Sequence, residues 1–285
     1  MRRETQSVKV GGLLVRFERR GNGPALVLVP GLLGYSFSWR HVLHPLSRGR
    51  EVFALDMPGS GFSDCSSELD ATLHAAAERL LIFLDVLGIA SCDLIGSSYG
   101  GATALFLAAK HPERVRTLTL VSPANPWSHT GRKRLALLGM PFVGRLFPSL
   151  ARAFRPLHRI SVNRMYGDRS RVTADTLRGY SLPLMRKGVF EHAAKIAKNW
   201  RSGMVELEAA LSGASDTPTL ILWGSKDGVV DWASAAQLAR RFKHSRLAVI
   251  DGAGHLPYEE CPDEFASAVG SFLGEFSPAQ GLDGK

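Results

Sequence analysis

Apolar residues gather in short continuous runs that recur along most of the chain. Glycine or proline ends each run, which is typical of strands buried on both faces. The runs read PALVLVPG at 24–31, REVFALDMPG at 50–59, SCDLIG at 91–96, VRTLTLVSP at 115–123, TPTLILWG at 217–224 and SRLAVIDG at 245–252. Ahead of them, SVKVGGLLVRFERRG at 7–21 predicts two strands joined by a Gly-Gly turn.

Between these runs, apolar residues return at helical spacing. Thr72 opens a helix, and Gly88 stands where its C-cap belongs. The apolar stripe of this helix consists of Leu73, Ala77, Leu80, Leu81 and Leu84. Further helices are predicted over 99–110, over 232–242 and from 262 onward. The alternation predicts the α/β fold class, with a mostly parallel central sheet and helices on both faces.

The rhythm breaks between residues 124 and 215, where Arg, Leu, Phe and Pro abound and inserted helices are expected. Net charge marks the same segment. Of the 35 Lys and Arg residues, ten lie between Pro126 and Arg171, together with one acid, Asp168. The other 25 basic residues face 25 acids, so the whole excess of +9 sits in this segment. We predict a core domain of residues 1–123 and 216–285 and a helical insertion over 124–215.

Composition narrows the class of protein. The 285 residues are 45% hydrophobic and 21% charged, which is the balance of a globular chain with a sizeable core. No apolar run reaches the roughly 18–20 residues that cross a bilayer, and the start MRRETQSVKV lacks the apolar region of a secretory signal. Cys65, Cys92 and Cys261 have neither metal-site nor disulfide-like spacing. We expect a cytoplasmic protein with free thiols and without metal or cofactor.

A serine stands between two glycines at a predicted strand-to-helix junction, in LIGSSYGG at 94–101. Gly96-x-Ser98-x-Gly100 in that setting is the nucleophile elbow. The turn is so tight that neighbouring Cβ atoms would collide, and the serine hydroxyl is exposed at the carboxyl edge of the sheet. The backbone N–H of Tyr99 points to the same place. The pattern occurs often by chance, so the prediction depends on partner residues.

A nucleophilic serine needs a base, and the base needs an orienting carboxylate. Among nine histidines, His255 stands out because it follows a predicted strand in the glycine-rich turn GAGHLPYEE. Asp227 follows another strand in WGSKDGVVD and is the preferred acid. Asp231 remains the alternative acid. The order Ser98, Asp227, His255 is that of one known serine-hydrolase fold.

These motifs together resemble the α/β-hydrolase fold superfamily, and the resemblance covers nearly all of the chain. LVLVPGLLG is similar to its oxyanion loop, and LDMPGSGFSD to the turn after its fourth strand. LIGSSYGG matches the nucleophile elbow, while WGSKDGVV and GAGHLPYEECPDEF match the acid and histidine loops. The resemblance implies a cap-bearing serine hydrolase, similar to esterases and lipases, with an α/β-hydrolase core and a helical cap.

The resemblance also implies roles for the residues around the serine. An oxyanion hole is expected from the backbone N–H groups of Leu32 and Tyr99. Many relatives have His-Gly where this chain has Pro30-Gly31. Gly31, Asp56, Gly96 and Gly100 are expected to support the site structurally.

Proteins of this fold also have other functions. Dehalogenases and epoxide hydrolases of this fold use an aspartate nucleophile, which Ser98 argues against. A carbon–carbon (dienone) or amide hydrolase with the same triad remains an alternative; Leu256 stands where carbon–carbon hydrolases often carry Trp, although Arg164 or Trp200 could bind a dienol. A non-catalytic small-ligand receptor of the same fold is the alternative from another class.

The basic segment KRLALLGMPFVGRLFPSLARAFRPLHRI interleaves Leu, Phe and Met with Arg. One interpretation is a cap with an apolar underside and a solvated basic top. The other is a surface for anionic lipid or a rim for acidic substrates. The solvated top is the preferred interpretation, and peripheral contact with an anionic membrane through this segment is the alternative; the expected substrate is a small-molecule ester with an apolar acyl group. No nucleic-acid partner is expected, since nothing resembles a recognition helix or RNA-binding motif.

Overall fold

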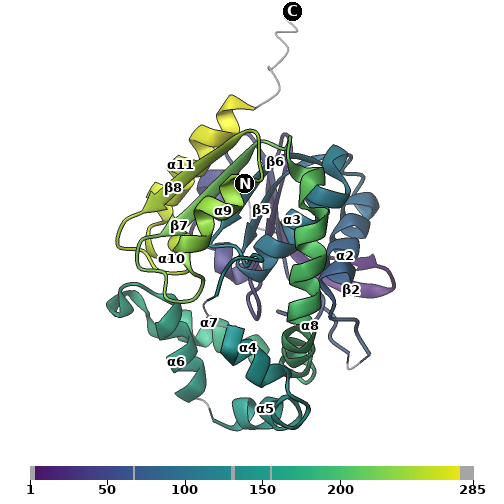
Figure 1. Cartoon of the computed structure of the whole chain (residues 1–285), viewed down its shortest axis with the longest axis vertical. Coiled ribbons are helices and arrows are strands. Elements are labelled where there is room, and N and C mark those ends of the chain that lie inside the picture. The colour runs from purple at the N-terminus through teal and green to yellow at the C-terminus, as the bar shows by residue number, and fades with distance from the viewer. Residues whose placement is uncertain (1–3, 67, 130–131, 155, 277–285) are drawn as a thin grey trace, which may run out of the picture.

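A computed structural model describes residues 4–66, 68–129, 132–154 and 156–276. Its centre is one eight-stranded sheet in the order β1-β2-β4-β3-β5-β6-β7-β8 (Figure 1). The strands are β1 (Glu4–Val10), β2 (Leu13–Gly21), β3 (Ala25–Val29), β4 (Glu51–Leu55), β5 (Cys92–Ser97), β6 (Val115–Val121), β7 (Thr219–Gly224) and β8 (Ser245–Ile250). The first two form an antiparallel hairpin, and β2 also pairs antiparallel with β4. All pairs from β4 to β8 are parallel, which confirms the predicted mostly parallel sheet.

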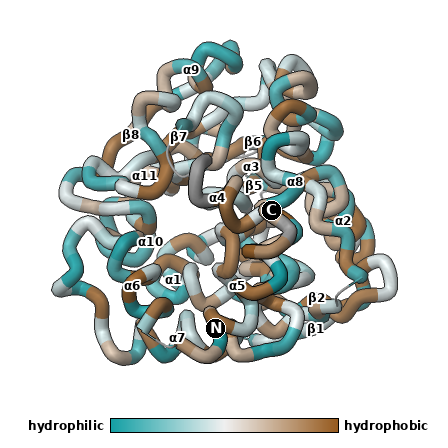
Figure 2. Tube along the Cα trace, turned by 60° about the horizontal axis from the view of Figure 1, so that its bottom comes forward, coloured by the Kyte–Doolittle hydropathy of each residue, from teal (hydrophilic) through white to brown (hydrophobic). Residues whose placement is uncertain are grey.

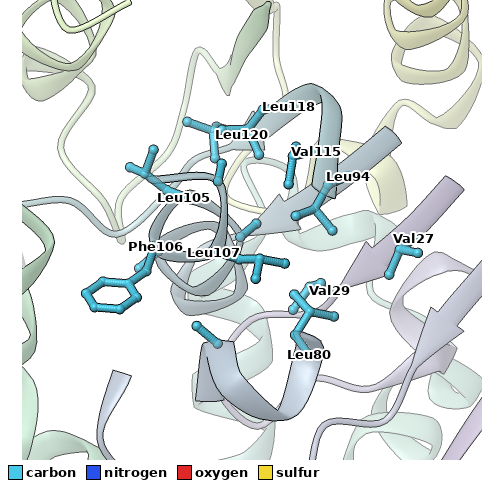
Figure 3. Packing of buried hydrophobic residues seen from close by; sticks show 14 of the residues in the cluster. Val27, Val29, Leu80, Leu94, Leu105, Phe106, Leu107, Val115, Leu118 and Leu120 are labelled. Carbon is cyan, nitrogen blue, oxygen red and sulfur yellow. The ribbon is translucent and has the colours of Figure 1, made fainter. Parts of the chain in front are cut away.

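Helices cover both faces of the sheet because its central strands are apolar on both sides. Val27 and Val29 of β3 point to one face, where they pack with Leu80 of α2 (Leu73–Val86) and Leu105 of α3 (Tyr99–Lys110) (Figure 3). The alternate residues Leu26 and Leu28 point to the other face. There they join α1 (Leu43–Leu46) and α11 (Pro262–Glu275). Two apolar layers therefore hold the sheet in place.

Local signals fixed several helix ends. The Thr72 hydroxyl accepts a hydrogen bond from Ala75 N–H at the start of α2, and Gly88 adopts φ +68° after its end. The helix predicted over 232–242 is wrong in extent: a 3₁₀ turn at Trp232–Ser234 precedes a short α9 (Ala235–Ala239). Asp231 caps this turn by accepting a hydrogen bond from Ala233 N–H. A short α10 (Pro257–Glu260) was not predicted.

The described residues between β6 and β7 form five α-helices. They are α4 (Arg132–Gly139), α5 (Pro141–Ala153), α6 (Pro156–Met165), α7 (Ala174–Leu184) and α8 (Val189–Ala210). Figure 1 shows α4–α7 gathered at one end of the sheet, with α8 running back from them alongside α3. We call this stretch the helical insertion. Among the described residues, no helix is both long and apolar enough to cross a membrane.

A buried carboxylate connects several elements near the amino end of strand β5. Asp93 at the start of β5 is 1% exposed and accepts hydrogen bonds from Arg50, Arg116 and the Thr117 hydroxyl. Arg50 also donates to the backbone oxygen of Leu273 in α11, at 2.9 Å. One negative charge thus balances two arginines and links three strands with a helix.

We expect Asp93→Asn to lower the free energy of unfolding by about 3 kcal/mol, because it leaves buried arginine charge uncompensated. Urea unfolding measures the loss. The matched control is Asp85→Asn, which removes an exposed partner of Arg114 and should cost less than about 1 kcal/mol. Equal losses from the two variants would contradict this account of Asp93.

Candidate functional site

Ser98 occupies the turn between β5 and α3 in a strained conformation. Its φ of +52° and ψ of −120° lie in a region that side-chain-bearing residues rarely adopt. Backbone hydrogen bonds hold it there: Ser98 N–H donates to Val121 O at 3.0 Å, and Ala124 N–H donates to Ser98 O at 2.9 Å. The end of β6 therefore fixes the turn from the side.

The glycines around Ser98 are required by the close approach of backbone segments. A Cβ atom at Gly100 would strike the carbonyl oxygens of Val29 and Pro30. A Cβ atom at Gly96 would strike Gly100 O and the Cα atom of Gly101. Only glycine lets α3 begin this close to β3 and β5, so the local sequence accounts for the geometry of the elbow.

The structure brings His255 and Asp227 together. His255 Nδ1 and Asp227 Oδ2 lie 2.9 Å apart, and the two side chains are 4% and 1% exposed. The other carboxylate oxygen of Asp227 accepts hydrogen bonds from the N–H groups of Val229 and Val230. Asp231 instead caps the turn after it and has no bond to His255 among the described residues. The alternative acid is therefore not placed to orient this histidine.

The charge of Asp227 is favoured despite its burial. Burial by itself raises the pKa of this carboxyl, whereas the charge of His255, its hydrogen bond and the Val229 N–H lower it. The net pKa lies below the ordinary value of 3.8. Asp227 is thus an anion that is hydrogen-bonded to Nδ1 of His255. The other ring nitrogen, Nε2, takes no part in this hydrogen bond.

Ser98 follows β5 and His255 follows β8 at the carboxyl edge of the sheet, with β6 and β7 lying between these two strands. Among the described residues, no hydrogen bond joins the Ser98 hydroxyl to the His255 ring. Catalytic hydrogen bonds of free enzymes are often long and tighten only with substrate. The acid–histidine half of the predicted set is thus assembled, and the serine–histidine half is not hydrogen-bonded.

The loop after β3 lies against Ser98. A Cβ atom built on Gly31 would stand 3.0 Å from Ser98 Cβ, so this backbone borders the serine. Gly34 N–H donates to Gly31 O at 2.9 Å, and Leu33 between them adopts φ +64°. In the described part of the chain, the backbone hydrogen bonds of turns and loops include none donated by Leu32 N–H or Tyr99 N–H. Tyr99 follows Ser98 directly in the chain, and Leu32 follows Gly31, whose backbone borders the serine.

Asp56 braces this loop from below. It is fully buried, and its two oxygens accept hydrogen bonds from Ser36 N–H at 2.9 Å and Phe62 N–H at 2.8 Å. Arg16 lies 3.3 Å from the same carboxylate. Ser60 donates to Gly34 O at 2.5 Å from the turn that follows Asp56. The loop with Pro30-Gly31 is therefore held by contacts that need no histidine side chain.

Sequence reasoning missed two carboxylates that join the helical insertion to the histidine loop. Glu260 accepts hydrogen bonds from Gly167 N–H and Asp168 N–H in the insertion, and from Gly254 N–H beside His255. His255 N–H itself donates to Met165 O at 2.7 Å. Glu260 is 4% exposed, and its partners are distant in sequence, so no local pattern marks it.

Glu259 makes the second connection. It is 8% exposed and accepts hydrogen bonds from the hydroxyls of Tyr166 and Tyr180, at 3.0 and 2.7 Å. Arg40 of the core completes the cluster through an ion pair with the same carboxylate. The only available signal was the pair of acids in GAGHLPYEE, directly after the histidine.

A pocket opens beside the oxyanion loop. It is lined by core and insertion residues that include Leu32, Thr72, Arg79, Tyr99, Thr103 and His192. His192 of α8 is 7% exposed, and its Nδ1 has no hydrogen-bond partner among the described residues. Its pKa is lowered from 6.5 to about 4. Burial is the largest cause, followed by the positive charges of Arg79 and Lys195, while the negative charge of Asp70 has a smaller, opposite effect.

Other predicted residues have ordinary surroundings. Arg164 is exposed and donates to Gly228 O at 3.1 Å, close to Asp227 in the chain. Trp200 packs against Tyr99, with ring centroids 5.9 Å apart. Cys65, Cys92 and Cys261 are free thiols whose pKa values burial raises. No group of three or more His, Cys, Asp or Glu residues in the described part of the chain could hold a metal ion.

Comparison with known proteins gives one family. Residues 24–262 match the family model described as alpha/beta hydrolase fold. The chain is 29% identical over 282 residues to 2-hydroxymuconate semialdehyde hydrolase of Pseudomonas sp. (strain CF600), covering 96% of this chain and 95% of that protein. It is 28% identical over 266 residues to the pimeloyl-[acyl-carrier protein] methyl ester esterase of Aeromonas hydrophila, covering 91% and 99%.

Among solved structures, the chain is similar to a bacterial membrane phospholipase A. The TM-score is 0.83 at 26% sequence identity, and the match covers 96% of this chain and 86% of the other. The similarity therefore includes the helical insertion as well as the sheet.

Because the pKa of His192 is lowered in the folded protein, we expect the free energy of unfolding to decrease at acidic pH. Unfolded histidine takes up a proton near pH 6.5, whereas folded His192 does so only near pH 4, so the stability it contributes above pH 6.5 is lost as pH falls through that window. The drop in pKa corresponds to about 3 kcal/mol. We expect His192→Gln to flatten the dependence of unfolding free energy on pH between 6.5 and 4. The control His244→Gln changes an exposed histidine and should keep the slope; an unchanged slope in the His192 variant would refute the prediction.

Proposed function

Because this chain belongs to the α/β-hydrolase fold family, we propose that it is a serine hydrolase that cleaves carboxylic esters through an acyl-enzyme. The observation that carries the proposal is the buried hydrogen bond between His255 and Asp227, 2.9 Å long, at the sheet edge where Ser98 stands in a strained elbow. A fixed histidine beside a serine in this conformation is what nucleophilic catalysis requires.

In the proposed reaction, Ser98 Oγ attacks the ester carbonyl while His255 Nε2 takes the hydroxyl proton. Asp227 holds the imidazole and stabilises its cation. The bond from the carbonyl carbon to the alcohol oxygen then breaks, and the alcohol leaves with the proton from His255. Water, deprotonated by His255, attacks the acyl-enzyme and releases the acid and Ser98.

The backbone N–H groups of Leu32 and Tyr99 are the proposed oxyanion hole. Negative charge develops on the carbonyl oxygen in each tetrahedral intermediate, and amides already aimed at it stabilise it without rearrangement. The support is that both amides border Ser98 and donate to no described residue outside regular structure. Gly31, Gly96, Gly100 and Asp56 hold these groups in place.

The helical insertion, residues 124–215, is proposed as the cap over this site, on a core of residues 1–123 and 216–285. His192 and Ala193 of α8 line the pocket beside the oxyanion loop, which supports a role in choosing the substrate. The proposed partners are a small-molecule ester with an apolar acyl group and, at the periphery, an anionic membrane surface. Similarity to a methyl ester esterase favours the ester.

Ser98→Ala tests the chemistry. We expect turnover of p-nitrophenyl esters, assayed from acetate to palmitate, to fall on the order of a thousandfold or more, because no other group forms the acyl-enzyme. Ser202→Ala removes an exposed hydroxyl on α8 and should leave the rates unchanged. Full turnover by the Ser98 variant would refute the proposal.

Carbon–carbon bond hydrolysis by the same residues is the second candidate, because the chain is 29% identical to 2-hydroxymuconate semialdehyde hydrolase. Against it, Leu256 follows the histidine and is buried, and Arg164 donates to a backbone oxygen. We expect kcat/KM for esters to exceed that for a dienone substrate by at least about tenfold. The reverse order would favour the carbon–carbon hydrolase, and ligand binding without Ser98-dependent turnover of either would favour a receptor.

A further inference from the structure

Helix α5 carries a stripe of large apolar side chains that face solvent. Phe142, Leu146 and Leu150 are four residues apart and 74%, 45% and 60% exposed. Residues spaced by four lie on one face of a helix. Phe154, the residue at which the helix ends, is also 55% exposed. We call these four residues the α5 stripe; Figure 2 brings this end of the molecule forward and shows the hydrophobic colour along α5.

The stripe is not the packed side of α5. Phe147 and Ala151 lie on another face, where they join Phe190 and Val189 of α8. The rings of Phe147 and Phe190 meet edge to face, with centroids 5.6 Å apart. The helix is therefore apolar on two sides, one buried in the molecule and one exposed. The interpretation of the segment as a cap with a solvated basic top does not describe this outer side.

Neighbouring elements extend the apolar surface. Leu137 on α4 and Met140 between the helices are 53% and 54% exposed. On α6, Leu157 and Ile160 are 36% and 59% exposed. Large contiguous apolar exposure is unusual for a surface that faces only water.

The charge beside this surface has one sign. Between residues 137 and 160 the sequence has four arginines and no acid. Arg145 on α5 and Arg159 on α6 are exposed, and neither forms an ion pair with a described residue. A second copy of this chain seated on the stripe by a twofold axis would bring these arginines against their equivalents, which is unfavourable.

The geometry points to the α5 stripe as the surface that inserts into an anionic phospholipid bilayer. Apolar side chains flanked by arginines are what binds the boundary between acyl chains and anionic headgroups. The inference rests on the peripheral contact in the proposed function and names the residues that make it. The packed side of α5 shares an apolar cluster with Leu33 of the oxyanion loop, so the docked helix joins the bilayer surface to the site.

Vesicle co-sedimentation tests the inference. The full chain should bind vesicles of phosphatidylcholine and phosphatidylglycerol, bind pure phosphatidylcholine more weakly, and lose affinity as salt rises. We expect the double variant Phe142→Ser/Leu150→Ser to lower the partition coefficient about tenfold or more, because it removes two of the inserted side chains. The matched control is Val205→Ser, 62% exposed on α8, which should bind as the unaltered chain does.

A second double variant tests the electrostatic contribution of the arginines to vesicle binding. Arg145→Glu/Arg159→Glu should weaken binding to the anionic vesicles and leave binding to neutral vesicles nearly unchanged. Thermal unfolding confirms that each variant folds, and the Ser98→Ala chain should bind as tightly as the active one, which separates docking from catalysis. Equal binding by the stripe variant and the unaltered chain, or no binding to either vesicle, overturns the inference. A concentration-dependent dimer abolished by the stripe variant, without vesicle binding, assigns the surface to a second copy instead.

Discussion

Next to Ser98, the closest backbone approach is at Gly100, where any side chain would strike the carbonyl oxygens of Val29 and Pro30. This approach sets the distance between α3 and the loop after β3. It also forces Ser98 into its positive φ, because the chain must reverse within one residue to begin the helix. The strain is balanced by burial, since α3 packs its remaining length into the core of the sheet. The close packing of two backbone segments therefore accounts for the strained conformation of Ser98.

The sequence predicted the parts of the fold that depend on local order. Strands such as β3 and β7 are continuous apolar runs, and the sheet's two faces follow from alternate residues within them. The elbow at Ser98 and the loops that carry Asp227 and His255 were also visible, because each follows a strand end within a few residues. The extent of the helix over 232–242 was not, since Asp231 caps a first turn that is 3₁₀, at Trp232–Ser234, and α9 already ends at Ala239. Glu260 could not be predicted, because residues about ninety positions away donate to it.

Buried carboxylates organise the molecule in a consistent way. Asp56, Asp227 and Glu260 each accept backbone N–H groups from loops at the sheet edge, so each fixes a loop rather than a helix or strand. Such bonds hold charge in the interior without a matching cation for every acid. Exposed arginines of the helical insertion include Arg145 and Arg159, whereas Arg152 pairs with Glu191. Carboxylates inside the molecule therefore position backbone segments at the sheet edge.

The hydrogen bond from His255 N–H to Met165 O connects the histidine loop of the core to the helical insertion. By sequence, the insertion reads as a module placed between two halves of a finished core. Yet Glu260 takes two of its three N–H donors from that module, and its carboxylate would lose them if residues 124–215 were replaced by a short linker. The truncated core would carry a half-satisfied buried anion directly behind the histidine loop. Deleting the insertion would therefore remove hydrogen bonds from the histidine loop as well as helices from the end of the sheet.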